Sequence, residues 1–438
     1  MIGPYLRHPP AGRGADAQPM RDANARLEEA VGLARAIDLE VVEAGLVPLA
    51  AITPATFIGR GKVDEIAGLA KTHEAGLVIL DTALSPVQQR NLEKAWAAKV
   101  LDRTGLILEI FGRRAKTREG ALQVEHAHLS YQKSRLVRSW THLERQRGGF
   151  GFLGGPGETQ LESDRRVIEE RLARIERDLD KVKRTRQLHR LSRKRVPYPI
   201  IALVGYTNAG KSTLFNRLTG GQALEADMLF ATLDPTLRAI ALPGGTKAIL
   251  SDTVGFISDL PTTLIAAFRA TLEEVIEADI ILHVCDISHA DAKAQAQDVE
   301  RVLRELGIDT GENGRIIELW NKVDQLAPDA RARFANIAER QPAQRRPVLT
   351  SAITGEGLAA VSSAIESRLA HRRMTLELRV AAADGAGMAW LHRNVDVLDK
   401  VVEEDGSTVV RIRADRSKVE TALRKFSQPA GGQSHLLG

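Results

Sequence analysis

The sequence predicts an α/β protein whose central domain is a mostly parallel sheet with helices on both faces. Three observations predict this class. Residues 200–204 form a short apolar run, typical of a buried parallel strand, that leads directly into a glycine-containing loop. Strand and helix patterns then alternate up to about residue 368, as in a sheet built from βα units. The length of 438 residues exceeds one ordinary core, so further domains are expected on either side.

Composition indicates a globular protein, with 43% hydrophobic and 27% charged residues. No apolar run approaches the ~18 residues of a membrane span, and the first residues lack the apolar stretch of a signal peptide. We therefore expect a cytoplasmic protein, with peripheral association with membranes left open. The single cysteine, Cys285, excludes an internal disulfide framework, and its apolar surroundings favour a buried, inert thiol.

The charge is unevenly distributed, although the net charge is only +5. Residues 1–195 carry 34 basic against 25 acidic side chains, residues 196–370 carry 16 against 22, and residues 371–438 carry 11 against 9. This asymmetry indicates that the N-terminal part contacts a polyanion while the acidic centre carries the phosphate-binding loop.

The N-terminal half divides into a tail and an α/β domain. Residues 1–24, rich in Pro, Gly, Ala and Arg, predict a mobile tail. Residues 25–112 predict an α/β domain with a strand over the whole of 39–51, a helix over 62–72, a strand over 76–82 and a helix over 86–97 that Ser85 caps. Its Gly-x-Gly-Lys in FIGRGKVDEI lacks the spacing of a phosphate loop, so a turn before a helix is the better interpretation.

Residues 113–195 predict a basic helical hairpin around a glycine-rich loop. Residues 99–147 read as largely helical, and the loop at 148–157, GGFGFLGGPG, contains six glycines and a proline, which neither a helix nor a central strand tolerates. A plain linker is one interpretation. An interaction loop is favoured because linkers rarely expose residues such as Phe150, Phe152 and Leu153.

The helix predicted after this loop, over 158–195, needs a partner. Its apolar residues repeat at alternating spacings of four and three, typical of a coiled-coil seam, at Ile168, Leu172, Ile175, Leu179 and Val182. We expect an antiparallel pair with the preceding basic helix and the glycine loop at its tip. Residues 181–195 hold eight Lys or Arg and no acid, so contact with RNA phosphates is about as plausible as a solvated face.

The loop after the first central strand has the phosphate-binding pattern G-x-x-x-x-G-K-[S/T]. Its glycines allow backbone amides to surround phosphates, Lys211 reaches the β and γ phosphates, and Ser212 offers an oxygen ligand to Mg²⁺. The candidate nucleotide-binding residues here are Gly205, Tyr206, Thr207, Asn208, Ala209, Gly210, Lys211, Ser212 and Thr213.

Three further motifs and a switch-like segment follow in an order that one sheet can assemble. Asp252 of DTVG can hold Mg²⁺ through water, the Gly255 amide can sense a γ-phosphate, and Asp324 of NKVD can accept two hydrogen bonds that guanine offers and adenine does not. A backbone amide of TSA can read the guanine carbonyl. Together these motifs predict a guanine-nucleotide site. Its candidates are Phe230, Ala231, Thr232, Leu233, Asp234, Asp252, Thr253, Val254, Gly255, Asn321, Lys322, Val323, Asp324, Ser351 and Ala352, with Lys211, Thr232 and Gly255 as the catalytic candidates and Ser212 and Thr232 as the metal ligands.

At these residues the chain resembles translation-factor-like GTPases and, within them, the HflX family. The resemblance spans nearly the whole chain and is most specific in GGFGFLGGPGETQLE, with GYTNAGKSTLFN, FATLDPT and DTVGFI in the centre. It implies a GTPase that binds GTP and GDP with Mg²⁺, binds the large ribosomal subunit and its RNA, and splits or rescues stalled ribosomes under stress. It also implies an N-terminal domain that reaches toward the peptidyl-transferase region. We expect a monomer.

Phe256 follows DTVG, where a Ras-like enzyme has the glutamine that orients water. A phenyl ring cannot polarise water, so slow intrinsic hydrolysis and a stimulating partner are expected, although the ring could simply pack in a mobile switch. Residues 371–438 predict a small C-terminal α+β domain of order β-α-β-β-α without recognisable chemistry. A GTP-regulated RNA-binding assembly factor with incidental turnover remains the alternative, and an ATP-driven RNA remodeller is weaker because the chain has one complete phosphate loop.

Overall fold

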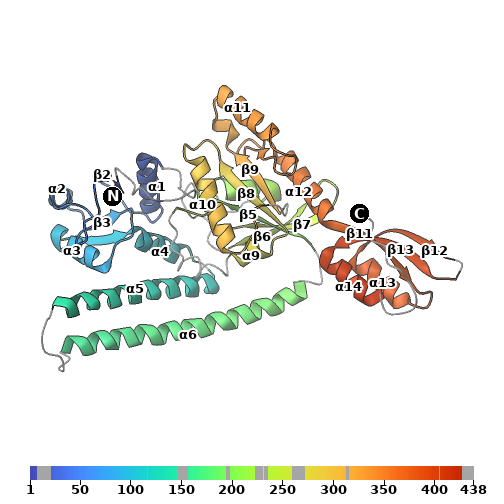
Figure 1. Ribbon diagram of the computed structural model, residues 1–438, viewed down its shortest axis with the longest axis horizontal. Helices are drawn as coiled ribbons and strands as arrows, with labels where there is room; N and C mark the ends of the chain where they lie inside the picture. The colour runs from blue at the N-terminus through green and yellow to red at the C-terminus, as the bar shows by residue number, and fades with distance from the viewer. Residues whose placement is uncertain are drawn as a thin grey trace.

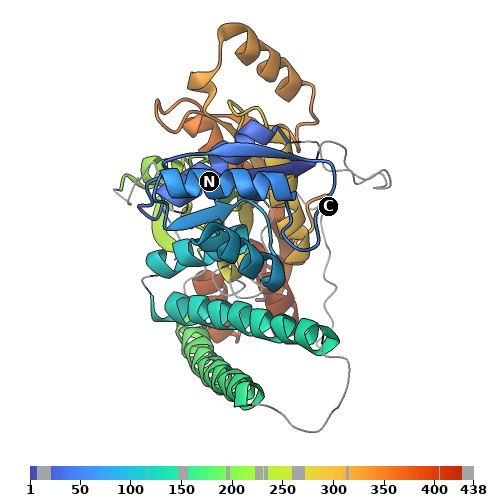
Figure 2. The same cartoon turned by 90° about the vertical axis from the view of Figure 1, so that its left-hand side faces the viewer.

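The computed structural model describes residues 1–6, 21–115, 117–146, 156–193, 198–221, 230, 235–258, 272–311, 315–403 and 405–426. Figure 1 shows an N-terminal α/β part at the left, the central sheet domain, and a small C-terminal domain at the right. Two long helices run side by side below the N-terminal part, and the view from the side in Figure 2 places them there as well. The predicted α/β class with flanking domains is confirmed. Within the described residues, no helix is both long and apolar enough to span a membrane.

The N-terminal part is a four-stranded parallel sheet of order β2-β1-β3-β4 with four helices. Ser85 caps α3 as predicted, in a capping box with Gln88. The elements are β1 (Ile2–Leu6), α1 (Ala23–Arg35), β2 (Gly45–Leu49), α2 (Arg60–Thr72), β3 (Leu77–Leu80), α3 (Pro86–Trp96), β4 (Lys99–Asp102) and α4 (Arg103–Arg114).

Three expectations for this part are wrong. Residues 1–24 are not a mobile tail throughout, because Ile2–Leu6 form β1 between β2 and β3, with Ile2 buried in the core. Residues 7–20 lie outside the described residues. The strand expected over 39–51 covers only Gly45–Leu49. The helical reading of 99–147 fails at its start, where Lys99–Asp102 pair with β3.

The predicted antiparallel hairpin is confirmed by α5 (Arg118–Gln146) and α6 (Pro156–Arg193). Ion pairs join Lys133 to Glu169 and Glu125 to Arg171. The residue with the higher number on α5 thus pairs with the lower number on α6, so the two helices are antiparallel. The predicted seam faces inward, with Leu172 and Ile175 buried. The last two residues of the expected glycine loop belong to α6, and 147–155 lie outside the described residues.

A buried carboxylate joins the hairpin to the N-terminal sheet. Asp102, at the end of β4, is 1% exposed and accepts hydrogen bonds from the amides of Leu84 (3.1 Å) and Gly105 (2.8 Å). The Tyr131 hydroxyl and the Arg135 guanidinium of α5 donate to the same carboxylate. A buried charge with this many donors is compensated, so Asp102 fixes the position of α5 on the N-terminal part.

The central domain is a six-stranded sheet of order β10-β9-β8-β5-β7-β6, parallel except for β6. Alternate residues of β5 pack on opposite faces. Ala202 and Val204 belong to the cluster that includes α10, whereas Ile201 and Leu203 belong to the cluster of α7 and α12. The elements are β5 (Ile200–Gly205), α7 (Lys211–Thr219), β6 (Thr236–Ala241), β7 (Lys247–Asp252), α9 (Glu273–Glu277), β8 (Ile280–Asp286), α10 (Ala292–Glu305), β9 (Ile316–Asn321), η1 (Val323–Gln325), α11 (Pro328–Glu339), β10 (Val348–Leu349) and α12 (Leu358–Arg372).

The C-terminal domain has the predicted β-α-β-β-α order and an antiparallel sheet of order β11-β13-β12. Its core contains Leu376, Leu391, Val410 and Ile412, all fully buried. The elements are β11 (Arg373–Val380), α13 (Gly385–Asn394), β12 (Asp396–Val402), β13 (Thr408–Asp415) and α14 (Arg416–Phe426).

Candidate guanine-nucleotide site

The phosphate-loop candidates form one continuous turn between β5 and α7. Gly210 has φ +92°, and a Cβ there would lie 2.3 Å from Asn321 Nδ2, so only glycine fits. Gly205 is equally constrained, because a Cβ would lie 2.3 Å from the carbonyl oxygen of Val284. Asn208 also has positive φ, at 59°. Thr207 and Ala209 are buried in this turn, and Thr213 lies in the first turn of α7. The backbone therefore has the tight curvature that surrounds an anion.

Lys211 is buried, and its Nζ donates to the Tyr206 carbonyl at 2.7 Å. Burial lowers the pKa of Lys211 to about 8, although the nearby Asp252 carboxylate acts in the opposite direction. His283 on β8 is also buried. Its own burial, and then the charge of Lys211, lower the pKa of His283 to about 4, so this imidazole is neutral at pH 7. The lysine ammonium is thus poorly solvated, and a phosphate beside it would restore a favourable partner.

The metal-ligand candidate of α7, Ser212, contacts Asp252 of β7, which is expected to hold Mg²⁺ through water. The Ser212 hydroxyl donates to Asp252 Oδ2 at 2.7 Å, which places a hydroxyl and a carboxylate oxygen together beside Lys211. Oxygen donors of this kind are what Mg²⁺ requires, so the residues present fit the ion. Thr232, the other candidate, lies outside the described residues, as do Ala231, Leu233 and Asp234.

The DTVG segment lies against the phosphate loop. Thr253 donates to the Leu203 carbonyl at 2.5 Å, and Val254 is buried. A Cβ on Gly255 would lie 2.9 Å from Thr207 Cα and 3.1 Å from Lys211 Nζ. Gly255 therefore approaches the loop and its lysine more closely than any other residue type could.

Phe256 is 1% exposed and packs in the cluster that contains Val254, Leu106 and Phe111. Phe230, 3% exposed, joins this cluster with its ring edge-on to Phe111, at a centroid distance of 4.8 Å. Phe230 is thus packed against α4 of the N-terminal part, and Phe256 is buried in the same hydrophobic cluster.

The base-reading candidates are tied to the phosphate loop by Asn321. Its Nδ2 donates to the Ala209 carbonyl at 2.8 Å, and its Oδ1 accepts from the Ala352 amide at 3.1 Å. Lys322 has φ +66° and pairs with Asp286 at 2.8 Å. Val323 and Ser351 are buried, whereas Asp324 is exposed beside them. The carboxylate of Asp324 is therefore accessible to a base bound above this surface.

Comparison with known proteins gives the family. Four family models match along the chain: "GTP-binding GTPase N-terminal" over 24–112, "GTP-binding GTPase Middle Region" over 114–193, "50S ribosome-binding GTPase" over 200–322 and "HflX C-terminal domain" over 336–433. A GTPase HflX of Magnetococcus marinus is 48% identical over 89% of this chain and 88% of its own length. The chain belongs to the HflX family of GTPases.

A second relative, GTPase HflX of Escherichia coli, is 45% identical over 82% of this chain and 83% of its own. Among solved structures, the crystal structure of the SsGBP and GDP complex is 26% identical, with a TM-score of 0.46, over 78% of this chain and 94% of that one. As an HflX-family member the chain is a GTPase.

Two side-chain contacts near the site were not predicted from the sequence. Arg217 of α7 donates to the carbonyls of Ala352 (3.1 Å) and Ile353, and so holds the end of the TSA segment. The side chain of Tyr206, placed among the nucleotide-binding candidates, instead turns to the N-terminal part, where it meets Glu29. Neither contact has a sequence signature, because the partners are 135 and 177 residues apart.

Proposed function

We propose that this HflX-family GTPase binds the large ribosomal subunit and couples GTP binding and hydrolysis to splitting or rescue of stalled ribosomes under stress. One observation carries the ribosomal part. The hairpin of α5 and α6 extends away from the central sheet domain, and Figure 1 shows the end of α5 and the start of α6 at its outer end. In the sequence, residues 147–155 between these two helices include Phe150, Phe152 and Leu153. The description of the family model over 200–322 as a 50S ribosome-binding GTPase supports the same partner.

At the nucleotide site, the amides of 205–213 and the Lys211 ammonium bind the phosphates in this proposal. Ser212 and Thr232 supply oxygen ligands to Mg²⁺, and Asp252 holds it through water. Mg²⁺, when bound, neutralises charge on the β and γ phosphates. Asp324 binds the N1–H and the amino group of guanine, and the TSA segment, with Ser351 and Ala352, reads its carbonyl.

Hydrolysis in this proposal depends on the partner. Gly255 contributes its amide to the γ-phosphate, but the neighbouring Phe256 has no group that can orient water and is buried in a hydrophobic cluster. We therefore infer that the monomer hydrolyses GTP slowly by itself, at about 10⁻⁴ to 10⁻³ s⁻¹ as in an unassisted small GTPase. The large subunit would then supply or organise the missing group.

Sucrose-gradient analysis tests this function. Intact ribosomes are mixed with the protein and either a non-hydrolysable GTP analogue or GDP, with Lys211→Ala as the matched control. The proposal expects the ribosomal subunits to separate in the presence of the analogue. It expects no separation with GDP, and none with the Lys211→Ala variant. Equal RNA binding in both nucleotide states without separation would favour neither this function nor the GTP-regulated assembly factor, and would indicate a passive RNA binder.

A further inference from the structure

A partly buried ion pair holds the lysine of NKVD from a neighbouring strand. Lys322 Nζ lies 2.8 Å from Asp286 Oδ2, and the two side chains are only 18% and 11% exposed, so solvent screens this pair weakly. Asp286 is the last residue of β8 and lies opposite Asn321, the last residue of β9. The Ile287 amide donates to the Asn321 carbonyl at 3.2 Å, which joins the two strand ends. Asp286 belongs to none of the nucleotide motifs, yet it contacts the centre of one of them.

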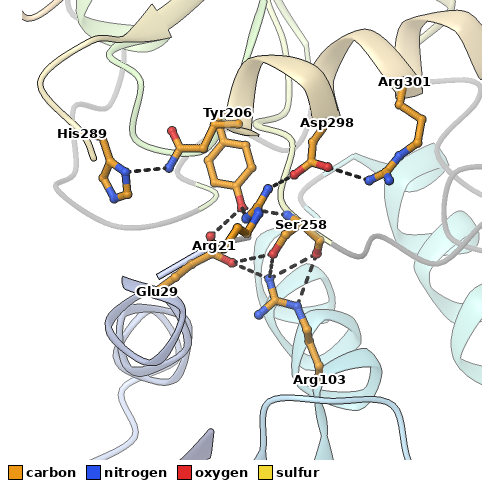
Figure 3. Close-up of polar contacts among 9 residues, drawn as sticks. Arg21, Glu29, Arg103, Tyr206, Ser258, His289, Asp298 and Arg301 are labelled. Atoms are coloured by element: carbon orange, nitrogen blue, oxygen red, sulfur yellow. Dashed lines mark hydrogen bonds and ion pairs between the residues drawn. The ribbon is translucent and has the colours of Figure 1, made fainter. Parts of the chain in front are cut away.

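The position of Asp286 is fixed by the segment that follows β8. Its Oδ1 accepts from the amide (3.0 Å) and from the hydroxyl (2.5 Å) of Ser288. The segment continues to His289, whose Nδ1 accepts from the Asp291 amide (3.0 Å) and from the side chain of Gln295 in α10 (3.3 Å) (Figure 3). The segment is thus held at both ends, and the carboxylate of Asp286 has a fixed place beside the NKVD turn.

Lys322 has a backbone conformation that residues with a Cβ adopt rarely. Its φ is +66°, in the left-handed region, and it directly precedes η1, which contains Asp324. This conformation turns the chain between Asn321, which is bonded to the phosphate loop, and Asp324, which is exposed. An unfavourable backbone conformation persists only where the surrounding contacts hold it, and the ion pair with Asp286 is such a contact.

We propose that Asp286 is a positioning residue for guanine recognition, which acts through Lys322. It binds the lysine ammonium, this bond keeps the NKVD turn in its left-handed conformation, and the turn presents the Asp324 carboxylate to the base. Asp286 also neutralises the charge of Lys322, which would otherwise oppose the charge of Asp324. A carboxylate at the base favours the two N–H donors of guanine and repels an anionic base, such as that of xanthosine nucleotides at neutral pH. The inference rests on the proposed contact of Asp324 with guanine.

The test compares the affinities of the isolated protein for GDP and for xanthosine diphosphate. Asp286→Asn removes the charge but keeps an oxygen that can accept from Ser288, so the segment after β8 retains its bond. We expect GDP to bind about five- to thirtyfold more weakly, as for the loss of one hydrogen-bonded ion pair. The freed ammonium should offset part of this loss for the anionic base, so the ratio of xanthosine diphosphate affinity to GDP affinity should rise.

Asp329→Asn is the matched control. Asp329 carries the same charge, is exposed, and lies in the first turn of α11, close behind NKVD in the sequence. Its replacement should leave both affinities unchanged.

A double-mutant cycle tests whether Asp286 acts through Lys322. Lys322→Gly removes the ammonium and adopts a positive φ without strain, so Asp286→Asn added to it should change GDP affinity less than about twofold. Three results would overturn the proposal: wild-type GDP affinity in Asp286→Asn, an equal loss for both nucleotides, or an equal loss of GDP affinity with and without Lys322. An equal loss for both nucleotides would mean that Asp286 only stabilises the fold.

Asp324→Asn separates this inference from the proposed base site. If Asp324→Asn and Asp286→Asn both leave GDP affinity unchanged, the contact of Asp324 with guanine is itself wrong. If Asp324→Asn weakens GDP binding and Asp286→Asn does not, only the role of Asp286 is rejected. Since no ribosome is present, neither result depends on the ribosomal function.

Discussion

Asn321 donates from Nδ2 to the carbonyl of Ala209 at 2.8 Å, so the base-reading motif is bonded directly to the phosphate loop. Asn321 is 1% exposed and also accepts from Ala352, so it connects three segments that are distant in the sequence. We propose that a nucleotide with its phosphates in this loop has its base directed to Asp324.

Base selection is predicted to depend on Asp324. Asp324→Asn replaces one acceptor by a donor and leaves a guanine N–H without a partner, which should cost about 1 to 3 kcal/mol of GTP affinity. The same variant should bind xanthosine triphosphate more tightly. Fluorescent-nucleotide titration measures both, and an unchanged GTP affinity would remove Asp324 from the site.

Nucleotide affinity is predicted to depend on Arg217, which belongs to none of the nucleotide motifs. Arg217→Ala removes the donors to the carbonyls of Ala352 and Ile353, so the TSA segment loses its support. We expect GDP affinity to fall by about 1 to 2 kcal/mol, roughly five- to thirtyfold. Arg346→Ala serves as a control, because Arg346 is exposed and donates to the Glu339 carbonyl in α11. Equal affinities in the two variants would contradict the role of Arg217.

Nucleotide binding is predicted to take up a proton at alkaline pH. The pKa of Lys211 is lowered by burial to about 8, below its ordinary 10.5, and a bound phosphate should raise it again. Without nucleotide, Lys211 binds more protons in the unfolded chain than in the native protein between pH 8 and pH 10.5. Its contribution to the free energy of unfolding therefore rises with pH in this window. Calorimetry of GDP binding in buffers of different ionisation enthalpy should show uptake rising from about a quarter of a proton at pH 7.5 to about three quarters at pH 8.5. Identical proton uptake at pH 7.5 and pH 8.5 would contradict the lowered pKa of Lys211.

The connection between α5 and α6 is predicted to be the working end of the hairpin. Replacing Phe150, Phe152 and Leu153 by serine should leave GTP binding and much of the ribosome binding intact yet stop subunit separation, because aromatic stacking on unpaired bases is worth about 1 to 3 kcal/mol per base. Separation at the wild-type rate would make this segment a linker.

The basic end of α6 is predicted to bind RNA phosphates. Replacing Arg184, Arg186, Arg193 and Lys194 by glutamine should weaken ribosome binding and reduce its salt dependence, because each lost phosphate contact lowers the slope of affinity against salt. Binding measured between low and physiological salt tests this. If the slope of ribosome affinity against salt concentration equals that of the wild type, these residues form a solvated surface and do not contact RNA.

The nucleotide motifs could be found in the sequence because phosphate and guanine chemistry requires fixed residue types at fixed spacings. Gly210, for example, has no alternative beside Asn321. β1 could not be found, since Ile2–Leu6 contains Gly and Pro and becomes a strand only by pairing with β2 and β3. The bonds of Arg103 to Ser258 join positions 155 residues apart, and only the packed structure brings them together.

Turnover of GTP with isolated large subunits tests the central claim most directly, with isolated small subunits as the matched control. The buried Phe256 predicts slow hydrolysis by the protein alone, an increase of orders of magnitude with large subunits, little change with small subunits, and no turnover in Lys211→Ala. A fast basal rate that large subunits leave unchanged would contradict a GTPase whose activity depends on the ribosome.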